Sequence, residues 1–235
     1  FVRTILIQIY SIVIIPISLE IFMENLCILD FDGTILNSTD AWNRIYCKFC
    51  KDRQLPILKS LLNAQKQSAF TDWIILIRDC YHLEIGFNEI MNLFNEIAIE
   101  VYNQIPPKEG FFDFINLIEK SYKIVIISKE ASSLISSWLK TNNIEFVSEV
   151  LQDRIDQRKD MELFQGLLAN YKIPTKKMIF IDDNLSHCIV SKKIGLYTIG
   201  INDEHSKIRQ EEMEKSCDLY VNDFQEIIKY YLWKN

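Results

Sequence analysis

The stretch that decides the fold is Leu26-Cys27-Ile28-Leu29-Asp30-Phe31-Asp32-Gly33-Thr34. Four apolar residues lead directly into two acids that are separated by one residue and followed by a glycine. A short apolar run that ends at a turn predicts a buried strand, and glycine lets the backbone turn sharply. Open parallel sheets bind their ligands at the carboxyl ends of their strands. We therefore expect Asp30 and Asp32 to stand at such an edge.

The D-x-D spacing has a chemical meaning. Side chains alternate along a strand, so Asp30 and Asp32 start on the same side. Two adjacent carboxylates repel each other unless a cation lies between them, and a hard cation such as Mg²⁺ suits oxygen ligands. D-x-D alone is equally typical of an ordinary turn, where Asp and Gly are common. The full D-x-D-G-T string after a buried strand favours a site.

Composition sets limits on the class of protein. The chain has 235 residues, 49% of them hydrophobic, and a formal charge of −6. This length allows one large domain, or a core with an insertion. The acidic balance predicts no nucleic-acid partner, because phosphate backbones are bound mainly by Lys and Arg. Six cysteines follow no disulfide or zinc pattern, and the single C-x-x-C at Cys47 and Cys50 has no matching second pair.

The first 22 residues differ from the rest of the chain. No charged residue occurs from Thr4 to Leu19, a run shorter than a membrane span needs, and Pro16 interrupts it. We expect Met23 to be the natural start and residues 1–22 to be an appended or upstream segment. The alternative is a targeting segment or membrane anchor. Apart from that alternative, we expect no membrane association and a cytoplasmic protein.

Periodic apolar patterns predict an alternation of helices and strands after residue 106. The expected helices there are 110–120, 130–141, 160–171, 185–194 and 224–232, and the expected strands are 123–128, 145–150, 178–182, 196–201 and 218–221. Strands that alternate with helices of this length indicate an α/β fold, a Rossmann-like parallel sheet flanked by helices.

A different pattern separates Asp30 from Ser128. These two strand ends stand far further apart than the roughly 30 residues of one βαβ unit. Helical patterns over 40–51, 55–69, 72–81 and 87–104 fill the surplus. We therefore expect an inserted all-helical domain at 38–105, and a core domain made of 23–37 and 106–235.

Polar residues also follow the other predicted strands. Ser128 ends the second strand, Asp182 and Asp183 end a later one, and Lys159 begins the helix before it. Parallel strands with right-handed crossovers bring their carboxyl ends to one edge. Each residue alone has an ordinary explanation as a cap, a turn residue or a surface cation. Together they predict one site.

Asp30-Phe31-Asp32-Gly33-Thr34 resembles the first motif of the haloacid dehalogenase-like (HAD) hydrolase superfamily. Ser128, Lys159 and the pair Asp182-Asp183 resemble its other three motifs, in the same order. The resemblance runs over nearly the whole chain from Leu26. It implies that the helical insertion is a cap of the C1 type, as in phosphoglycolate phosphatase-like and β-phosphoglucomutase-like members.

The resemblance also implies roles for these residues. Asp30 would be the nucleophile that forms an aspartyl-phosphate, and Asp32 the acid and base. Ser128, Lys159 and Lys129 would bind the phosphoryl group, and Thr34 would support the loop. Mg²⁺ would be held by Asp30, the backbone carbonyl of Asp32, and Asp183. Asp182 and His187 would orient their neighbours.

Three positions depart from the family pattern. His187 stands where Asp or Asn is usual, Lys129 where Asn is frequent, and Asn37 where Asp is common. They remove no catalytic group, but they blur the inference of a substrate; a second cation at Lys129 would suit a more anionic one. Arg44, Lys48 and Arg78 are further candidates for contacts at the entrance of the site.

The function we expect is Mg²⁺-dependent hydrolysis of a small phosphorylated metabolite. Asp32 favours phosphoester cleavage over dehalogenation, because only a phosphoester's leaving oxygen needs a proton from that position. One alternative is a phosphomutase of the β-phosphoglucomutase type. Another is a catalytically silent binding or regulatory module on the same fold. The sequence does not specify the substrate or the oligomeric state.

Overall fold

The computed structural model describes residues 25–65, 69–152, 159–203 and 209–234. Its centre is a six-stranded sheet in which neighbouring strands pair in parallel, with the order β3-β2-β1-β4-β5-β6. The strands are β1 (Asn25–Leu29), β2 (Tyr122–Ser128), β3 (Val147–Gln152), β4 (Met178–Asp182), β5 (Tyr197–Ile201) and β6 (Leu219–Val221). The predicted α/β class is confirmed, and the strand that carries the D-x-D motif lies between β2 and β4.

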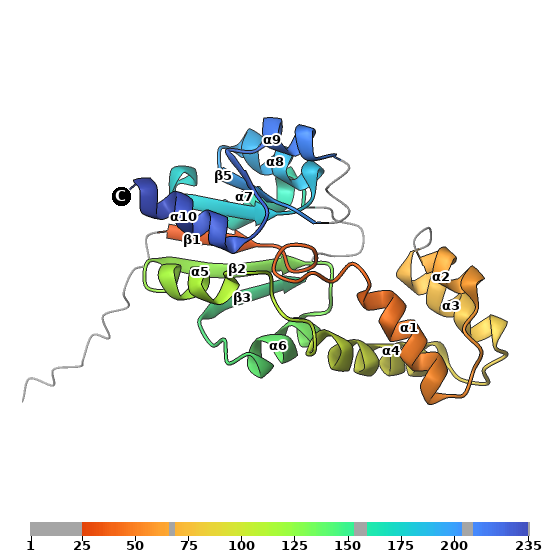
Figure 1. The fold of residues 1–235 in the computed structure, drawn as a ribbon. Helices are drawn as coiled ribbons and strands as arrows, with labels where there is room; N and C mark the ends of the chain where they lie inside the picture. The colour runs from red at the N-terminus through yellow and green to blue at the C-terminus, as the bar shows by residue number, and fades with distance from the viewer. Residues whose placement is uncertain (1–24, 66–68, 153–158, 204–208, 235) are drawn as a thin grey trace, which may run out of the picture.

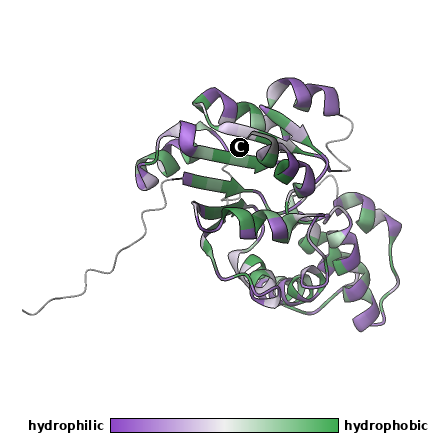
Figure 2. Ribbon diagram, turned by 60° about the vertical axis from the view of Figure 1, so that its left-hand side comes forward, coloured by the Kyte–Doolittle hydropathy of each residue, from purple (hydrophilic) through white to green (hydrophobic). Residues whose placement is uncertain are grey.

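Alternate residues of the strands pack against different helices. Cys27 and Leu29 belong to one hydrophobic cluster, whereas Leu26 and Ile28 belong to another. The first cluster includes α5 (Phe111–Ile118), α6 (Ser132–Thr141) and α10 (Phe224–Lys234). The second includes α7 (Met161–Tyr171) and part of α8 (Leu185–Ile194), and α9 (Gln210–Ser216) packs on α8. Because both faces of the sheet are covered, the central strands β1, β2 and β4 each carry four consecutive apolar residues (Figure 2).

Four further helices form the expected all-helical insertion. They are α1 (Ala41–Asp52), α2 (Lys59–Gln65), α3 (Phe70–Cys80) and α4 (Phe87–Tyr102), and they lie together to one side of the sheet (Figure 1). Aromatic rings fill the space between them: Phe49 of α1 stacks on Phe94 of α4 with 4.5 Å between ring centroids. Trp73 of α3 donates a hydrogen bond of 2.7 Å to the carbonyl of Leu61 in α2. These contacts hold the four helices together, and their buried side chains continue the cluster that contains Cys27 and Leu29 of β1.

One predicted helix differs from the structure. The pattern over 55–69 predicts a single helix, but α2 begins only at Lys59 and α3 begins at Phe70. Pro56 explains the late start, because its ring restricts the residue before it and its nitrogen has no hydrogen to donate. The structure also contains α9 and a short 3₁₀ helix, η1 (Thr175–Lys177), which the apolar pattern does not predict.

The chain returns from α4 to the sheet alongside the loop that follows β1. Lys108 donates its backbone N–H to the carbonyl of Ile35 at 2.8 Å. Pro107 forms an antiparallel bridge with Leu36, which is itself bridged to Asp32. Both ends of the insertion are thus tied to the same short loop.

Among the described residues, no helix has the length and apolar character that crossing a membrane requires. The prediction about residues 1–22 falls outside the described part of the chain.

Gly110 marks the point where the returning chain turns into α5. Its φ of +77° lies in the left-handed region, which favours glycine. A Cβ atom at this position would lie 2.5 Å from the backbone nitrogen of Gln225 in α10. The backbone carbonyl of the neighbouring Glu109 accepts a 3.0 Å hydrogen bond from the N–H of Phe224. Gly110 therefore allows α10 to pack closely on the start of α5.

We expect Gly110→Ala to lower the free energy of unfolding by about 2–4 kcal/mol, from backbone strain and overpacking together. Urea titration followed by circular dichroism would measure this change. Gly166→Ala is a matched control, because it lies inside α7 with nothing within 4 Å of its added Cβ. The control should be neutral or stabilising by up to about 1 kcal/mol. Equal effects of the two substitutions would contradict the packing role of Gly110.

Candidate active site

The loop after β1 places Asp30 at the carboxyl edge of the sheet. Asp30 still continues the strand pairing, because its N–H donates to the carbonyl of Ile181 in β4 at 3.0 Å. The chain then turns, and the N–H groups of Ile35 and Leu36 both donate to the carbonyl of Phe31, at 2.9 and 3.0 Å. The first acid of the motif is therefore fixed by the sheet, and the residues after it form a tight loop.

Gly33 brings this loop against Asp183. Its φ is +74°, and a Cβ at this position would lie 2.7 Å from an oxygen of the Asp183 side chain. Thr34 secures the approach with two hydrogen bonds. Its hydroxyl oxygen accepts from the Asp183 N–H at 3.0 Å, and its hydroxyl donates to Asp183 Oδ1 at 3.1 Å. Two strands that are distant in the sequence thus place their acids side by side.

Three carboxylates meet at this edge. Asp30, Asp182 and Asp183 each offer an oxygen, and these atoms lie within 4.8 Å of one another. Burial, followed by repulsion from the other two acids, raises the pKa of Asp183 well above its usual value. A set of carboxylate oxygens with too little positive charge nearby suits a hard divalent cation such as Mg²⁺. The residues present therefore fit the expected metal.

Lys159 is the buried cation of the site. It is 2% exposed, and its ammonium forms ion pairs with Asp30 and with Asp182, the latter at 2.8 Å. It stands directly before α7, whose first turn is capped by Asp160 through the N–H groups of Glu162 and Leu163 at 3.0 and 3.1 Å. The capped helix start thus fixes the backbone beside Lys159.

The two acids that contact Lys159 are affected differently. Burial raises the pKa of Asp30 to about 7, against the attraction of Lys159. Burial also acts on Asp182, but Lys159 and His187 outweigh it and lower its pKa to about 2. Lys159 and His187 therefore keep Asp182 ionised, whereas at Asp30 burial outweighs the attraction of Lys159.

Asp182 accepts more hydrogen bonds than a metal ligand would leave room for. Besides Lys159, it accepts from the N–H of Asn184 at 2.7 Å and contacts Nδ1 of His187 at 3.1 and 3.3 Å. His187 is 8% exposed and lies on α8, whose start is capped by Asn184. Asp30 and Asp183 accept fewer hydrogen bonds and are better placed for a metal, while the orienting role of Asp182 and His187 stays a prediction.

Ser128 lies at the end of β2 and is 2% exposed. Its hydroxyl oxygen accepts a 3.2 Å hydrogen bond from the N–H of Glu130, so the hydroxyl hydrogen is left to donate elsewhere. Lys129 is exposed and lines the same cavity as Ser128. The structure therefore brings both expected phosphate-binding residues to the edge that carries Asp30.

Asp32 is surrounded by groups that the sequence does not indicate. Tyr102, the last residue of α4, donates its hydroxyl to Asp32 Oδ1 at 2.9 Å. The side chains of Ser38 and Glu130 also hydrogen-bond with Asp32, whose pKa is raised by burial against these bonds. Burial and the charge of Asp32 likewise raise the pKa of Glu130 well above its usual value. Burial thus shifts the pKa values of Asp32 and Glu130 in the same direction.

A cavity of about 540 Å³ connects these side chains. Its walls combine sheet-edge residues with residues of the helical insertion, among them Trp42, Asn43, Gln65 and Tyr102. Arg44, Lys48 and Arg78, the entrance candidates, do not line it. Lys48 instead pairs with Asp52 and Glu100, each at 3.2 Å, and Arg78 pairs with Asp79 at 2.8 Å. Lys48 and Arg78 thus use their charges on the surface of the insertion, and contacts of these three residues with a substrate stay a prediction.

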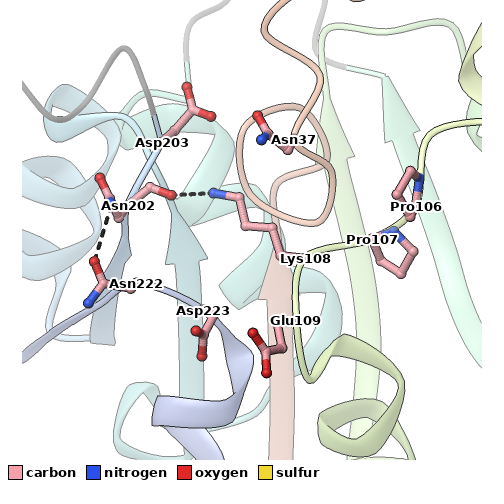
Figure 3. A pocket seen from close by; sticks show the side chains of 9 residues that line it. All are labelled: Asn37, Pro106, Pro107, Lys108, Glu109, Asn202, Asp203, Asn222 and Asp223. Atoms are coloured by element: carbon pink, nitrogen blue, oxygen red, sulfur yellow. Dashed lines mark hydrogen bonds between the residues drawn. The ribbon is translucent and has the colours of Figure 1, made fainter.

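A second cavity of about 450 Å³ is lined by the return segment and by residues that follow β5 and β6 (Figure 3). Lys108 lies in its wall, and its ammonium donates to the backbone carbonyls of Gly33 and Asn202. Asn37, the third departure from the family pattern, is exposed and lines this cavity. Lys108 therefore holds the loop beside Asp30 against the end of β5, a role that a single lysine in a return segment does not reveal in sequence.

Comparison with known proteins identifies the family. A model described as haloacid dehalogenase-like hydrolase matches residues 27–201. No curated protein matches the chain by sequence at a significant level. Solved structures with a similar fold include a putative β-phosphoglucomutase from Thermotoga maritima (14% identity, TM-score 0.67, covering 84% of this chain and 94% of that one).

Two further similar structures have different descriptions. One is the putative HAD-hydrolase YfnB from Bacillus subtilis, solved bound to magnesium (14% identity, TM-score 0.69, covering 90% of this chain and 99% of that one). The other is a predicted phosphoglycolate phosphatase from Haemophilus somnus (17% identity, TM-score 0.63, covering 89% and 98%). At these identities the likeness concerns the fold. Because the family model runs from within β1 to the end of β5, this protein belongs to the haloacid dehalogenase-like hydrolases, as the four motifs predict.

Proposed function

We propose that the protein hydrolyses a small phosphate monoester, with Mg²⁺, through an aspartyl-phosphate formed on Asp30. The observation that supports this most strongly is the position of Asp30. Its carboxylate faces the Lys159 ammonium, lies within 4.8 Å of oxygens of Asp182 and Asp183, and precedes the second acid, Asp32, by two residues. A nucleophile, a counter-charge and an acid thus converge on one point.

The chemistry needs these groups because a phosphoryl group repels an anionic nucleophile. Lys159 and Ser128 bind the oxygens of the phosphoryl group and reduce this repulsion. Asp30 attacks phosphorus, and Asp32 gives a proton to the departing alcohol oxygen. Asp32 then takes a proton from the water that attacks the aspartyl-phosphate. Asp182 and His187 keep Lys159 in place between the acids.

Asp30, Asp183 and the backbone carbonyl of Asp32 are the proposed ligands of Mg²⁺. When bound, the ion supplies positive charge that offsets both the carboxylates and the phosphoryl oxygens. The magnesium complex of the Bacillus subtilis protein supports this assignment by analogy.

Residues 38–105 are the proposed cap, and 23–37 with 106–235 the proposed core. Tyr102 and Trp42 support this division, because they come from opposite ends of the insertion and reach Asp32 and Glu130. A cap that touches the acid in this way excludes water from the site and surrounds the leaving group.

The alternative is a phosphomutase, and the similar fold of the putative β-phosphoglucomutase from Thermotoga maritima supports it. A mutase would transfer the phosphoryl group from Asp30 to a second hydroxyl of its substrate. Conversion of a hexose 1-phosphate without release of free phosphate would favour it. The assay that follows therefore measures free phosphate.

We expect Asp30→Asn to reduce phosphate release by roughly 10³-fold or more, because an amide cannot attack phosphorus. The assay is phosphate release from p-nitrophenyl phosphate and from a panel of phosphorylated metabolites, with Mg²⁺ present. Asp72→Asn, an exposed acid on α3, is the control and should retain wild-type activity. An Asp30→Asn variant that hydrolyses as fast as the wild type would show that the mechanism is wrong.

We expect Thr34→Val to weaken Mg²⁺ binding by about 10–100-fold, because Asp183 loses both of its bonds to the hydroxyl. Valine has nearly the same shape, so the loop should keep its packing. Isothermal titration of the folded protein with MgCl₂ measures the affinity independently of activity. Thr141→Val at the exposed end of α6 is the control. If Thr34→Val binds Mg²⁺ as tightly as the wild type, Thr34 does not position Asp183 for the metal.

A further inference from the structure

Glu130 is a partly buried acid that the proposed mechanism does not use. It stands two residues after Ser128, and its N–H donates to the Ser128 hydroxyl at 3.2 Å. Glu130 lines the same cavity as Ser128 and Asp32, and it interacts with Asp32, the group proposed to protonate the leaving oxygen. Glu130 is therefore close to both the proposed phosphate-binding residue and the proposed acid.

The insertion holds Glu130 in this position. Trp42 of α1 donates its indole N–H to Glu130 Oε1 at 3.2 Å. The Trp42 ring is itself packed against Phe70, with 4.6 Å between centroids, and lies edge-on to Trp73 at 6.5 Å. A carboxylate that is fixed between the core and a rigid aromatic group has a defined direction, which is what selective binding requires.

Glu130 shares its cavity with another acid, Asp40, and Trp42 already uses its donor on Glu130. Among the described residues that line the cavity, the cations are Lys159, which is buried between Asp30 and Asp182, and Lys129, which is exposed. An anionic substituent next to the ester oxygen would therefore face a carboxylate, whereas a hydroxyl or an ammonium would find an acceptor.

We propose that Glu130 is a specificity-determining residue, which binds a hydroxyl or ammonium group one or two carbons from the ester oxygen and disfavours a carboxylate there. This inference rests on the proposed function, since the proposed role of Asp32 as the acid defines where the leaving group lies. It names the substrate class as phosphate monoesters of polyols or amino alcohols rather than of hydroxy acids. It also reverses the expectation that Lys129 indicates a more anionic substrate.

Three two-carbon monoesters test the proposal directly. They are O-phosphoethanolamine, 2-hydroxyethyl phosphate and phosphoglycolate, which carry an ammonium, a hydroxyl and a carboxylate, respectively. Their dissociation constants are measured by calorimetry with Mg²⁺ on the Asp30→Asn protein, which binds without turning over. We expect phosphoglycolate to bind at least about 10-fold more weakly than O-phosphoethanolamine, because like charges repel in a partly buried site.

Two substitutions at Glu130, made on the same background, then assign the preference. Glu130→Gln should bring the ratio of the two constants close to one, and Glu130→Lys should invert it in favour of phosphoglycolate. Glu89→Gln, an exposed residue of α4, is the control and should keep the original ratio. The ratio of the two dissociation constants does not change when a variant binds both esters more weakly to the same extent. Circular dichroism shows whether each variant is folded.

Equal affinity for the three esters, or a ratio that Glu130→Gln leaves unchanged, would overturn the assignment. The proposed function is tested separately by phosphate release from p-nitrophenyl phosphate with the wild-type protein. A protein that hydrolyses this ester but shows no order among the three probes retains the function and loses the role of Glu130. A protein that shows the order but releases no phosphate retains the binding preference and loses the proposed reaction.

Discussion

The structure depends on one buried ammonium group. Lys159 lies between Asp30 and Asp182 with 2% of its surface exposed, and three carboxylates share that edge of the sheet. Without a cation, charges so close together in a buried site would repel strongly or become protonated. Lys159 therefore makes it possible for the ends of β1 and β4 to lie next to each other in the protein as it folds. The same charge is then available to a phosphoryl group.

This electrostatic constraint explains why the loop after β1 is held so firmly. Gly33 approaches Asp183 too closely for any side chain, and Thr34 bonds to the same residue twice. On the opposite side, Lys108 donates to the carbonyls of Gly33 and Asn202. A second lysine, outside the acid cluster, thus fixes the loop from behind. The position of Asp30 is set by contacts to two strands and to the return segment of the insertion.

The part of the site that could be predicted from sequence is the part that strand topology controls. Asp30, Ser128, Lys159 and Asp183 each follow or precede a strongly apolar segment, and parallel strands bring such ends together. Tyr102 could not be predicted, because its spacing on α4 is that of an ordinary core residue. Glu130 has no special spacing, and Lys108 acts through backbone carbonyls that leave no trace in sequence. The start of α2 was predicted wrongly because the apolar pattern begins at Leu55, before Pro56, whereas the helix begins at Lys59.

Two residues that the sequence did not indicate, Tyr102 and Trp42, join the insertion to the core. Tyr102, at the end of α4, bonds to Asp32, and Trp42, near the start of α1, bonds to Glu130, which bonds to Asp32 in turn. Asp32 therefore contacts a side chain at the end of the insertion directly, whereas Asp30 is held by the sheet and by the loop that Lys108 contacts. A displacement of α1 or α4 would leave the proposed nucleophile where it is and move the partners of the proposed acid. Phosphoryl binding and proton delivery are consequently controlled by different parts of the chain, and only the second depends on how the insertion sits over the leaving group.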